Sequence, residues 1–141
     1  MAGQYILRSR FCIEGHGTGT PVGDRTELEG IALAMAAEGE IAPRSCGVTS
    51  FKSLVGHTKA AAGIGGLIKA VMAVNQRIVP PTVGCQEPNS IFETHALPLY
   101  PILQGEIHQP TTILKAGVSA MGFGGINSHV TLISVDAASP R

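Results

Sequence analysis

The chain opens with a short apolar run followed by a helical pattern. Residues 11–14 are largely apolar and β-prone, which predicts a buried strand. Residues 25–38 place apolar side chains on one face of a helical period, which predicts an amphipathic helix. Asp24 has the character of its N-cap, Glu27 has the spacing that completes a capping box, and Gly39 ends the helix. The apolar positions of this helix are Leu28, Ile31, Ala32 and Met35.

A strand and a helix recur in the next segment. Residues 46–51 predict a second buried strand, which runs into a loop that becomes a helix near Thr58. A glycine inside a helix costs about 1 kcal/mol relative to alanine, so we expect this helix to be buried where another backbone approaches closely. Its apolar positions are Ile64, Leu67, Ile68 and Val71, and its internal glycines are Gly63, Gly65 and Gly66.

The remainder combines a proline-punctuated stretch with two more strands. Pro80 and Pro81 begin a stretch that extends to about residue 112, which we expect to wrap the surface rather than to form a core layer. Residues 112–121 and 128–135 predict strands joined by the glycine-dense turn GFGGIN. The order of strand, helix, strand, helix, long loop and two strands indicates an α/β half-domain with a mixed sheet.

Length, charge and cysteine content narrow the class of protein. At 141 residues, the chain is one domain or a piece of a larger one. Lys and Arg together number 10, as do Asp and Glu, and no basic cluster suggests a nucleic-acid surface. No apolar run approaches the roughly 20 residues of a membrane span, and the N-terminus has no signal-peptide pattern. Three cysteines without CxxC spacing indicate a reduced, cytoplasmic setting, and no metal-binding motif is present.

Three glycine-rich strand ends carry the candidate chemistry, at residues 15–20, 52–57 and 122–127. Loops at the ends of strands are where α/β proteins usually place functional groups, so we expect these three loops to converge. The groups that they carry are His16, Lys52, His57 and the backbone amides around Phe123.

Two histidines near a lysine suit the stabilisation of an oxyanion. Neutral imidazoles of His16 and His57 can both donate N–H bonds to one developing oxyanion. The ammonium of Lys52 would lower their pKa values and keep them neutral. Thr18 and Thr20 place hydroxyls on a common side of an extended segment, where they suit an amide-bearing arm. Taken singly, these motifs have structural alternatives, namely a turn histidine, a surface lysine and a simple hairpin, but their occurrence in order favours a functional site.

Four segments together resemble a known family: EGHGTGTPVGD, SFKSLVGHTKAAAGIGGLIKAV, VPPTVG and GVSAMGFGGINSHVTL. Over about residues 11–135, the chain is similar to the C-terminal half of a β-ketoacyl synthase. Gly66 replaces an acidic residue, so the chain resembles the type I polyketide synthase branch, most closely its iterative enediyne or polyunsaturated type. Residues 1–10 are then a leader or junction, and residues 136–141 a tail or linker.

The resemblance implies a fold and a reaction. The fold is the C-terminal half of a thiolase-like layered α/β/α/β/α fold, with a mixed sheet and a buried Gly/Ala-rich helix. The reaction is decarboxylative Claisen condensation, in which a malonyl-carrier thioester loses carbon dioxide and its enolate attacks an acyl group held on cysteine. His16 and His57 match the histidines that hydrogen-bond the malonyl thioester oxygen. Lys52 matches the lysine that organises these histidines.

The resemblance also implies binding elements. The amide of Phe123 matches an oxyanion-hole donor, its ring matches a gate beside the nucleophile, and Gly124 follows it in the same motif. Thr18 and Thr20 match hydroxyls that hold the phosphopantetheine arm of an acyl carrier protein. No bound cofactor is implied, because the substrates travel on that arm.

The family's nucleophilic cysteine has no counterpart in this sequence. Its motif joins cysteine and serine at a helix start, whereas Cys12 and Cys46 lie in expected strands and Cys85 in a loop. The implied partners are therefore an N-terminal ketosynthase half that carries the cysteine, an acyl carrier protein, and a second copy in a homodimer of the full synthase. This chain alone would be inactive for condensation. Two alternatives stay open: a non-catalytic structural or interaction module, and a stand-alone thioester decarboxylase or hydrolase.

Overall fold

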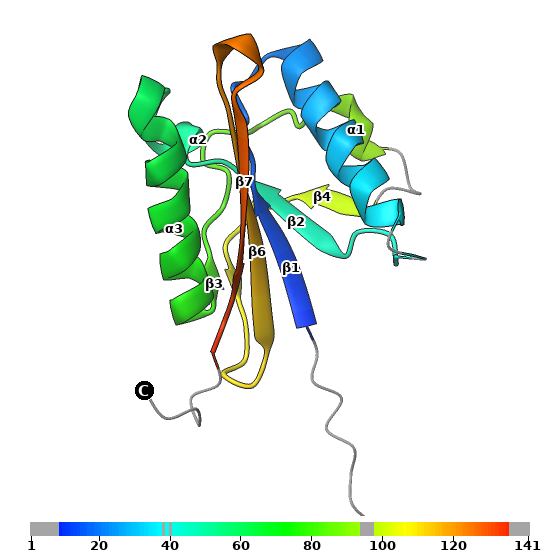
Figure 1. Cartoon of the computed structure of the whole chain (residues 1–141). Coiled ribbons are helices and arrows are strands. Elements are labelled where there is room, and N and C mark those ends of the chain that lie inside the picture. Colours follow the sequence, from blue (N-terminus) through cyan, green and yellow to red (C-terminus); the bar gives the residue numbers. More distant parts are fainter. Residues whose placement is uncertain (1–8, 38, 40, 94–97, 136–141) are drawn as a thin grey trace, which may run out of the picture.

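The structure, a computed structural model, describes residues 9–37, 39, 41–93 and 98–135 (Figure 1). Residues 1–8 of the expected leader and the expected tail at residues 136–141 lie outside the described residues. Residues 9 and 10 begin the first strand.

A five-stranded mixed sheet forms the centre of the chain, with the strand order β4-β2-β1-β6-β7. Strand β1 is central and pairs in parallel with both β2 and β6, while β4 pairs in parallel with β2 and β7 in antiparallel with β6. The predicted mixed sheet is confirmed. Its strands are β1 (Ser9–Glu14), β2 (Cys46–Thr49), β4 (Leu99–Pro101), β6 (Ile113–Met121) and β7 (Asn127–Ile133).

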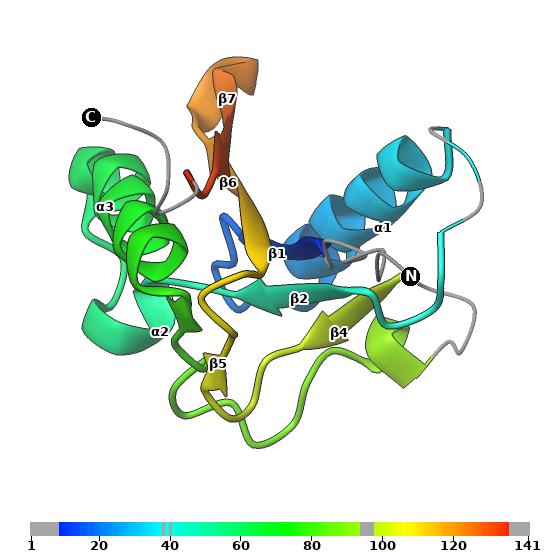
Figure 2. The same cartoon turned by 90° about the horizontal axis from the view of Figure 1, so that it is seen from below.

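Two long helices cover opposite faces of this sheet, as the view along the strands shows (Figure 2). Helix α1 (Pro21–Ala37) packs over one buried cluster, and helix α3 (Ala62–Gln76) packs over the other. No helix in the described part of the chain is long and apolar enough to cross a membrane. The shorter elements are α2 (Lys52–Val55), η1 (Lys59–Ala61), η2 (Ser90–Glu93) and η3 (Phe123–Gly125), and the separate antiparallel pair β3 (Ile78–Val79) and β5 (Glu106–Ile107).

Helix α1 confirms the predicted helix but begins earlier, at Pro21. Proline is favoured in the first turn, because its fixed φ suits a helix and its missing N–H needs no partner there. Asp24 is therefore not the N-cap; it lies within the first turn and accepts a hydrogen bond from the Gly19 N–H at 3.2 Å. Leu28 and Ala32 are buried against the sheet, as the apolar period predicted.

Helix α3 buries its Gly/Ala-rich face against the sheet, as predicted, but most of its large apolar side chains lie on the other face. Its buried face consists of small residues and one lysine, whereas Ile64 and Ile68 are each 55% exposed. Small side chains allow the helix to lie close to the sheet, so the larger apolar side chains are left on the outer face. The buried residues are Ala62, Gly66, Lys69, Ala70, Ala73 and Val74.

The glycines of α3 are explained by close neighbours that are side chains rather than a backbone. A Cβ on Gly65 would lie 2.3 Å from the ring of Phe51, and a Cβ on Gly66 would lie 3.1 Å from Cγ of Glu14. The expected close approach is therefore present, but its partners are a ring and a carboxylate.

The proline-punctuated stretch contributes to the core, which corrects the expectation that it only wraps the surface. Strand β4 joins the edge of the main sheet, and Leu99 and Ile102 are each 1% exposed. Leu99 belongs to the cluster beneath α1 and Ile102 to the cluster beneath α3. Because successive residues of a strand point to opposite faces, one short apolar run supplies both clusters.

Candidate active site

The predicted convergence of loops follows from the register of the sheet. Strands β1, β2 and β6 run in parallel, so the loops after their carboxyl ends meet at one edge of the sheet. The Met121 N–H, at the end of β6, donates to Nδ1 of His16 at 3.2 Å. Residues more than one hundred positions apart in the sequence therefore meet at the histidine.

His16, Lys52 and His57 come together at this edge. The rings of His16 and His57 lie edge to face with centroids 5.9 Å apart. The Lys52 ammonium lies 3.4 Å from Nδ1 of His16 and donates a hydrogen bond to the His16 carbonyl oxygen. The structure thus gathers two imidazoles and one ammonium, as the glycine-rich motifs predicted.

Backbone donors fix the tautomer of each imidazole. Nδ1 of His16 accepts the Met121 N–H, and Nδ1 of His57 accepts the Lys59 N–H at 3.1 Å. A neutral imidazole that accepts at one nitrogen carries its proton on the other. Both rings therefore have an Nε2–H available as a donor when neutral.

Burial and charge keep His16 in the neutral form. The pKa of His16 is lowered, mainly because partial burial disfavours its charged form and further because Lys52 and His57 lie nearby. Burial also lowers the pKa of Lys52, while the carboxylates of Glu14 and Glu27 oppose that shift. The lysine thus favours a neutral His16.

Glu27 holds the loop that carries His16. Its Oε1 accepts the His16 N–H at 2.7 Å and its Oε2 accepts the Gly17 N–H at 3.0 Å. Ser50, which directly follows β2, supports the same loop by donating to the Gly17 carbonyl oxygen at 3.2 Å. Gly17 has φ +42, and a Cβ there would lie 2.8 Å from Oγ of Ser50, so the position requires glycine. The capping-box interpretation of Glu27 is therefore replaced by a loop-anchoring role.

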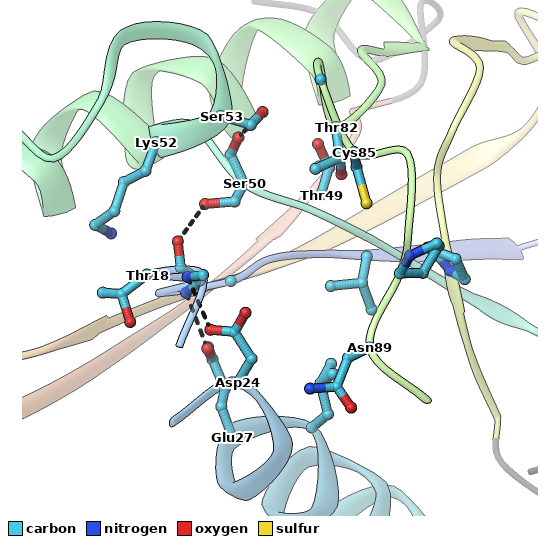
Figure 3. Close-up of a pocket in the computed structure, with 18 of the residues that line it drawn as sticks. Thr18, Asp24, Glu27, Thr49, Ser50, Lys52, Ser53, Thr82, Cys85 and Asn89 are labelled. Carbon is cyan, nitrogen blue, oxygen red and sulfur yellow. Dashed lines mark hydrogen bonds between the residues drawn. The ribbon is translucent and has the colours of Figure 1, made fainter. Parts of the chain in front are cut away.

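A cavity of about 690 Å³ opens beside these groups (Figure 3). Lys52 and Thr18 lie on one side of it, with Cys85 and Asn89 on the other. The hydroxyls of Thr18 and Thr20 are 3.4 Å apart, and their segment is irregular rather than an extended strand. Other lining residues are Asp24, Glu27, Thr49, Ser53, His57 and Thr82.

The second wall of the cavity comes from the segment between β3 and η2. The Val83 N–H donates to Oγ of Ser53 at 3.1 Å, and the Asn89 amide donates to the Pro21 carbonyl oxygen at 3.3 Å. These two bonds tie the segment to α2 on one side and to the start of α1 on the other. The motif VPPTVG covers the start of this wall, although the sequence analysis assigned no role to its residues.

Phe123 and Gly124 lie in η3, on the turn between β6 and β7. The Phe123 side chain is fully exposed, and Gly124 has φ +78 in the left-handed region. Among the described residues, the cavity lining includes neither of them. Their turn nevertheless reaches the site, because Met121, two positions before Phe123, bonds to His16.

The three cysteines differ in their burial: Cys12 and Cys46 are buried, and Cys85 is partly exposed. Burial raises the pKa of the Cys12 thiol to about 12, and burial likewise raises the pKa of Cys46. Both thiols stay protonated near neutral pH and are unsuited to nucleophilic attack. Cys85 is partly exposed and lines the cavity.

Two buried charged residues in this region were not singled out by the sequence analysis. Lys69 of α3 and Glu14 of β1 are buried at 8% and 4% exposure, with Nζ and Oε2 2.8 Å apart. A lysine inside a helix of small residues and a glutamate ending a buried strand were the available signals, because buried charges need partners.

The structure is an α/β unit with a mixed sheet, and two imidazoles lie together at the ends of its parallel strands. Comparison with known proteins identifies the family to which this unit belongs. Residues 11–86 match the family model for the C-terminal domain of beta-ketoacyl synthases. The chain therefore belongs to the beta-ketoacyl synthase C-terminal domain family, and the resemblance seen in the sequence is confirmed.

Curated relatives are large synthases. Over 126 residues the chain is 38% identical to a polyunsaturated fatty acid synthase polypeptide of Thraustochytrium sp., in a match that covers 85% of this chain and 4% of that protein. Over 126 residues it is 39% identical to the highly reducing polyketide synthase virA of Hypocrea virens, in a match that covers 89% of this chain and 5% of that protein. The chain thus spans a small fraction of these relatives.

Solved structures show the same fold. The ketosynthase from module 1 of the bacillaene synthase of Bacillus amyloliquefaciens FZB42 matches 92% of this chain with a TM-score of 0.82 and 28% identity. The ketosynthase from module 6 of the bacillaene synthase of Bacillus subtilis 168 matches 89% of this chain with a TM-score of 0.80 and 33% identity. This chain covers 23% of each of those chains, and its fold is the C-terminal part of a thiolase-like ketosynthase.

Proposed function

We propose that this chain supplies the decarboxylation and pantetheine-binding elements of a polyketide ketosynthase. In the proposed reaction, the bond between the malonyl α-carbon and its carboxylate breaks, carbon dioxide leaves, and the electron pair forms a thioester enolate. The enolate carbon then attacks the carbonyl of an acyl thioester held on cysteine. That carbon–carbon bond forms as the cysteine thiolate leaves.

The observation that carries this proposal is the paired tautomer of His16 and His57. Their Nδ1 atoms accept the N–H groups of Met121 and Lys59, so each Nε2–H is available to the enolate oxygen. Preorganised donors of this kind stabilise developing negative charge, because they need no reorganisation during the reaction. Lys52 supports the role by favouring the neutral imidazole of His16.

The cavity supports the binding part of the proposal. Phosphopantetheine offers amide groups along an extended arm, and Thr18 at the cavity wall, with Thr20 beside it, provides hydroxyls that can bond to them. Phe123 and Gly124 lie on a turn anchored at His16, and we propose that the Phe123 amide completes the oxyanion site when the turn meets the partner half. The exposed Phe123 ring is free to act as a gate there.

We also propose that the nucleophilic cysteine comes from an N-terminal ketosynthase half. Cys12 and Cys46 have raised pKa values because they are buried, so neither suits the acyl-acceptor role. Family membership supports a partner half, since this chain covers 23% of the matched ketosynthase chains. An acyl carrier protein would deliver both thioesters.

The test combines the chain with an N-terminal ketosynthase half. We expect an acyl adduct on the partner's cysteine by intact mass, and carbon dioxide release from a malonyl-carrier thioester. His16→Ala or His57→Ala should each lower carbon dioxide release by roughly 10²–10³-fold, the usual cost of losing one oxyanion donor. His108→Gln is the matched control, because His108 pairs with Glu106 at 3.5 Å outside the site.

The outcomes separate the alternatives. Association of the halves without any acyl adduct would contradict the condensation proposal. Unchanged properties after both histidine substitutions would favour a non-catalytic interaction module, whose specific support is the exposed apolar face of α3. Carbon dioxide release by the chain alone would favour a stand-alone decarboxylase.

A further inference from the structure

A buried ion pair lies directly behind the proposed active site. Nζ of Lys69 lies 2.8 Å from Oε2 of Glu14 and 2.8 Å from Oγ1 of Thr49. The other carboxylate oxygen, Oε1 of Glu14, accepts the backbone N–H of Phe51. One carboxylate therefore bonds to helix α3 through one oxygen and to the turn after β2 through the other.

The position of Glu14 places it between the two loops that carry the site. Along β1 it precedes Gly15 and His16, and its hydrogen-bond partner Phe51 immediately precedes Lys52. Lys52 in turn bonds to the His16 carbonyl oxygen. Glu14, Phe51, Lys52 and His16 are thus linked in a ring, here called the circuit: two hydrogen bonds join them across space, and the chain joins Phe51 to Lys52 and Glu14 to His16.

Helix α3 is shaped around this circuit. A Cβ at Gly66 would lie 3.1 Å from Cγ of Glu14, and a Cβ at Gly65 would lie 2.3 Å from the ring of Phe51. The two glycines make room for the carboxylate and for the ring of the residue that the carboxylate holds. The helix thereby fixes both Glu14 and Phe51 from one side.

Stability alone is a weak explanation for such a pair. Removing two charges from water costs several kcal/mol per ion, and apolar residues of similar volume are often as stable or more so. Burial raises the pKa of Glu14, opposed mainly by Lys69 and also by the Phe51 N–H. An apolar residue could replace the buried volume of the carboxylate but not its hydrogen bonds to the Phe51 N–H and to Lys69.

We propose that Glu14 is a positioning residue: its carboxylate anchors the Phe51 N–H and so holds Lys52 beside His16, and Lys69 is the buried counter-ion of that carboxylate. The inference rests on the proposed function for its purpose, since it concerns how the decarboxylation groups are held. It makes neither residue a contact of the substrate.

The test compares two double variants of the chain that lose the same two charges. Glu14→Gln with Lys69→Met keeps a side-chain oxygen that can accept the Phe51 N–H, and its amide can turn toward Thr49. Glu14→Met with Lys69→Met fills similar volume but offers no acceptor. Single variants are avoided as the main arm, because each leaves a buried charge without its partner.

The readout is the pH titration of the His16 imidazole, followed by NMR in the chain without any thioester. The charged or titratable groups that act on His16 are Lys52, His57 and Asp24. We expect the Gln–Met variant to keep the parent midpoint. We expect the Met–Met variant to shift the midpoint upward, because a released Lys52 no longer opposes protonation.

Every outcome decides the proposal. Equal midpoints in the two double variants would overturn it. Failure of either double variant to fold would also overturn it, because that result would assign the pair to the stability of the fold. Because no thioester is used, the result is independent of the decarboxylation assay. An inactive protein with the expected titration would reject the proposed function alone.

Discussion

At the scale of single residues, the backbone does much of the work of orienting the site. Lys59 holds φ +54, a left-handed conformation that costs a non-glycine residue on the order of 1 kcal/mol. That conformation accompanies the hydrogen bond from its N–H to Nδ1 of His57. The end of β6 does the same for His16 through the Met121 N–H. Strain at one position and strand geometry at another therefore give the same result, a neutral imidazole that carries its proton on Nε2.

Lys52→Met is predicted to raise the pKa of His16. Burial of the ring, the main cause of its lowered pKa, stays, but the ammonium 3.4 Å from Nδ1 is lost. An NMR titration of the histidines measures the change. Lys115→Met removes an exposed lysine near the start of β6 and serves as the control, which should leave the His16 midpoint in place. A parent-like midpoint in Lys52→Met would contradict the assigned electrostatic role.

The same shift predicts the direction of a pH effect on stability. Because the pKa of His16 lies below its ordinary value of 6.5 in the folded chain, the unfolded state takes up this proton first as the pH falls. The folded state then loses stability as the pH falls from about 6.5. In Lys52→Met the folded-state and unfolded-state pKa values of His16 lie closer together. Urea unfolding above and below pH 6.5 should therefore show that the free energy of unfolding falls less with falling pH than it does in the parent chain.

At the scale of elements, the two long helices use opposite solutions for packing on one sheet. Helix α1 buries regular apolar side chains such as Leu28, and Gly30 faces open space. Helix α3 buries small residues and a charge, and Gly65 lies against the ring of Phe51. Gly30 therefore has no packing role in α1, whereas Gly65 has a necessary one in α3.

Alanine at these two glycines is predicted to have opposite effects on the free energy of unfolding. Gly30→Ala should stabilise the chain by roughly 0.5–1 kcal/mol, because alanine favours the helix and nothing lies within 4 Å of the new Cβ. Gly65→Ala should destabilise it by about 1–3 kcal/mol, because the Phe51 ring must move. Urea unfolding measures both, and stabilisation by Gly65→Ala would contradict the described packing.

Most elements could be predicted from sequence periodicity, but the orientation of α3 could not. A helical period of Ile64, Ile68 and Val71 marks an apolar face without saying which surface covers it. In this chain the sheet is met by the small-residue face, and the apolar face is exposed. Strand β4 was missed because its three residues lie among prolines, which usually mark loops.

The site was predictable to a similar extent. Glycine-rich strand ends identified His16, Lys52 and His57, because parallel strands bring such ends to one edge. Glu27 was interpreted as a helix cap, since its spacing from Asp24 fits that pattern as well as it fits a loop anchor. Partners that meet only through tertiary packing, such as Glu14 and Lys69, leave no local spacing signal.

At the scale of the whole molecule, the outer face of α3 is an apolar surface that the rest of the described chain does not cover. Ile64, Ile68, Val71 and Met72 are exposed on one helix, and scattered apolar residues are normal but a contiguous set marks an interaction surface. The face lies on the opposite side of the sheet from α1, and α3 also carries the buried lysine behind the site (Figure 1). A ketosynthase half seated there would contact the helix that carries Lys69 on its other face.

Ile64→Lys combined with Ile68→Lys is predicted to weaken binding to an N-terminal ketosynthase half by tenfold or more. Burying one large aliphatic side chain contributes roughly 1.5–3 kcal/mol, and each 1.4 kcal/mol is a tenfold change in affinity. Both positions are 55% exposed, so the chain itself should fold as the parent does. Leu33→Lys on α1, 72% exposed on the other side of the sheet, is the matched control and should leave the affinity unchanged. If Leu33→Lys weakened binding as much as the α3 double substitution does, the α3 face would not be the specific contact, and the partner would bind elsewhere.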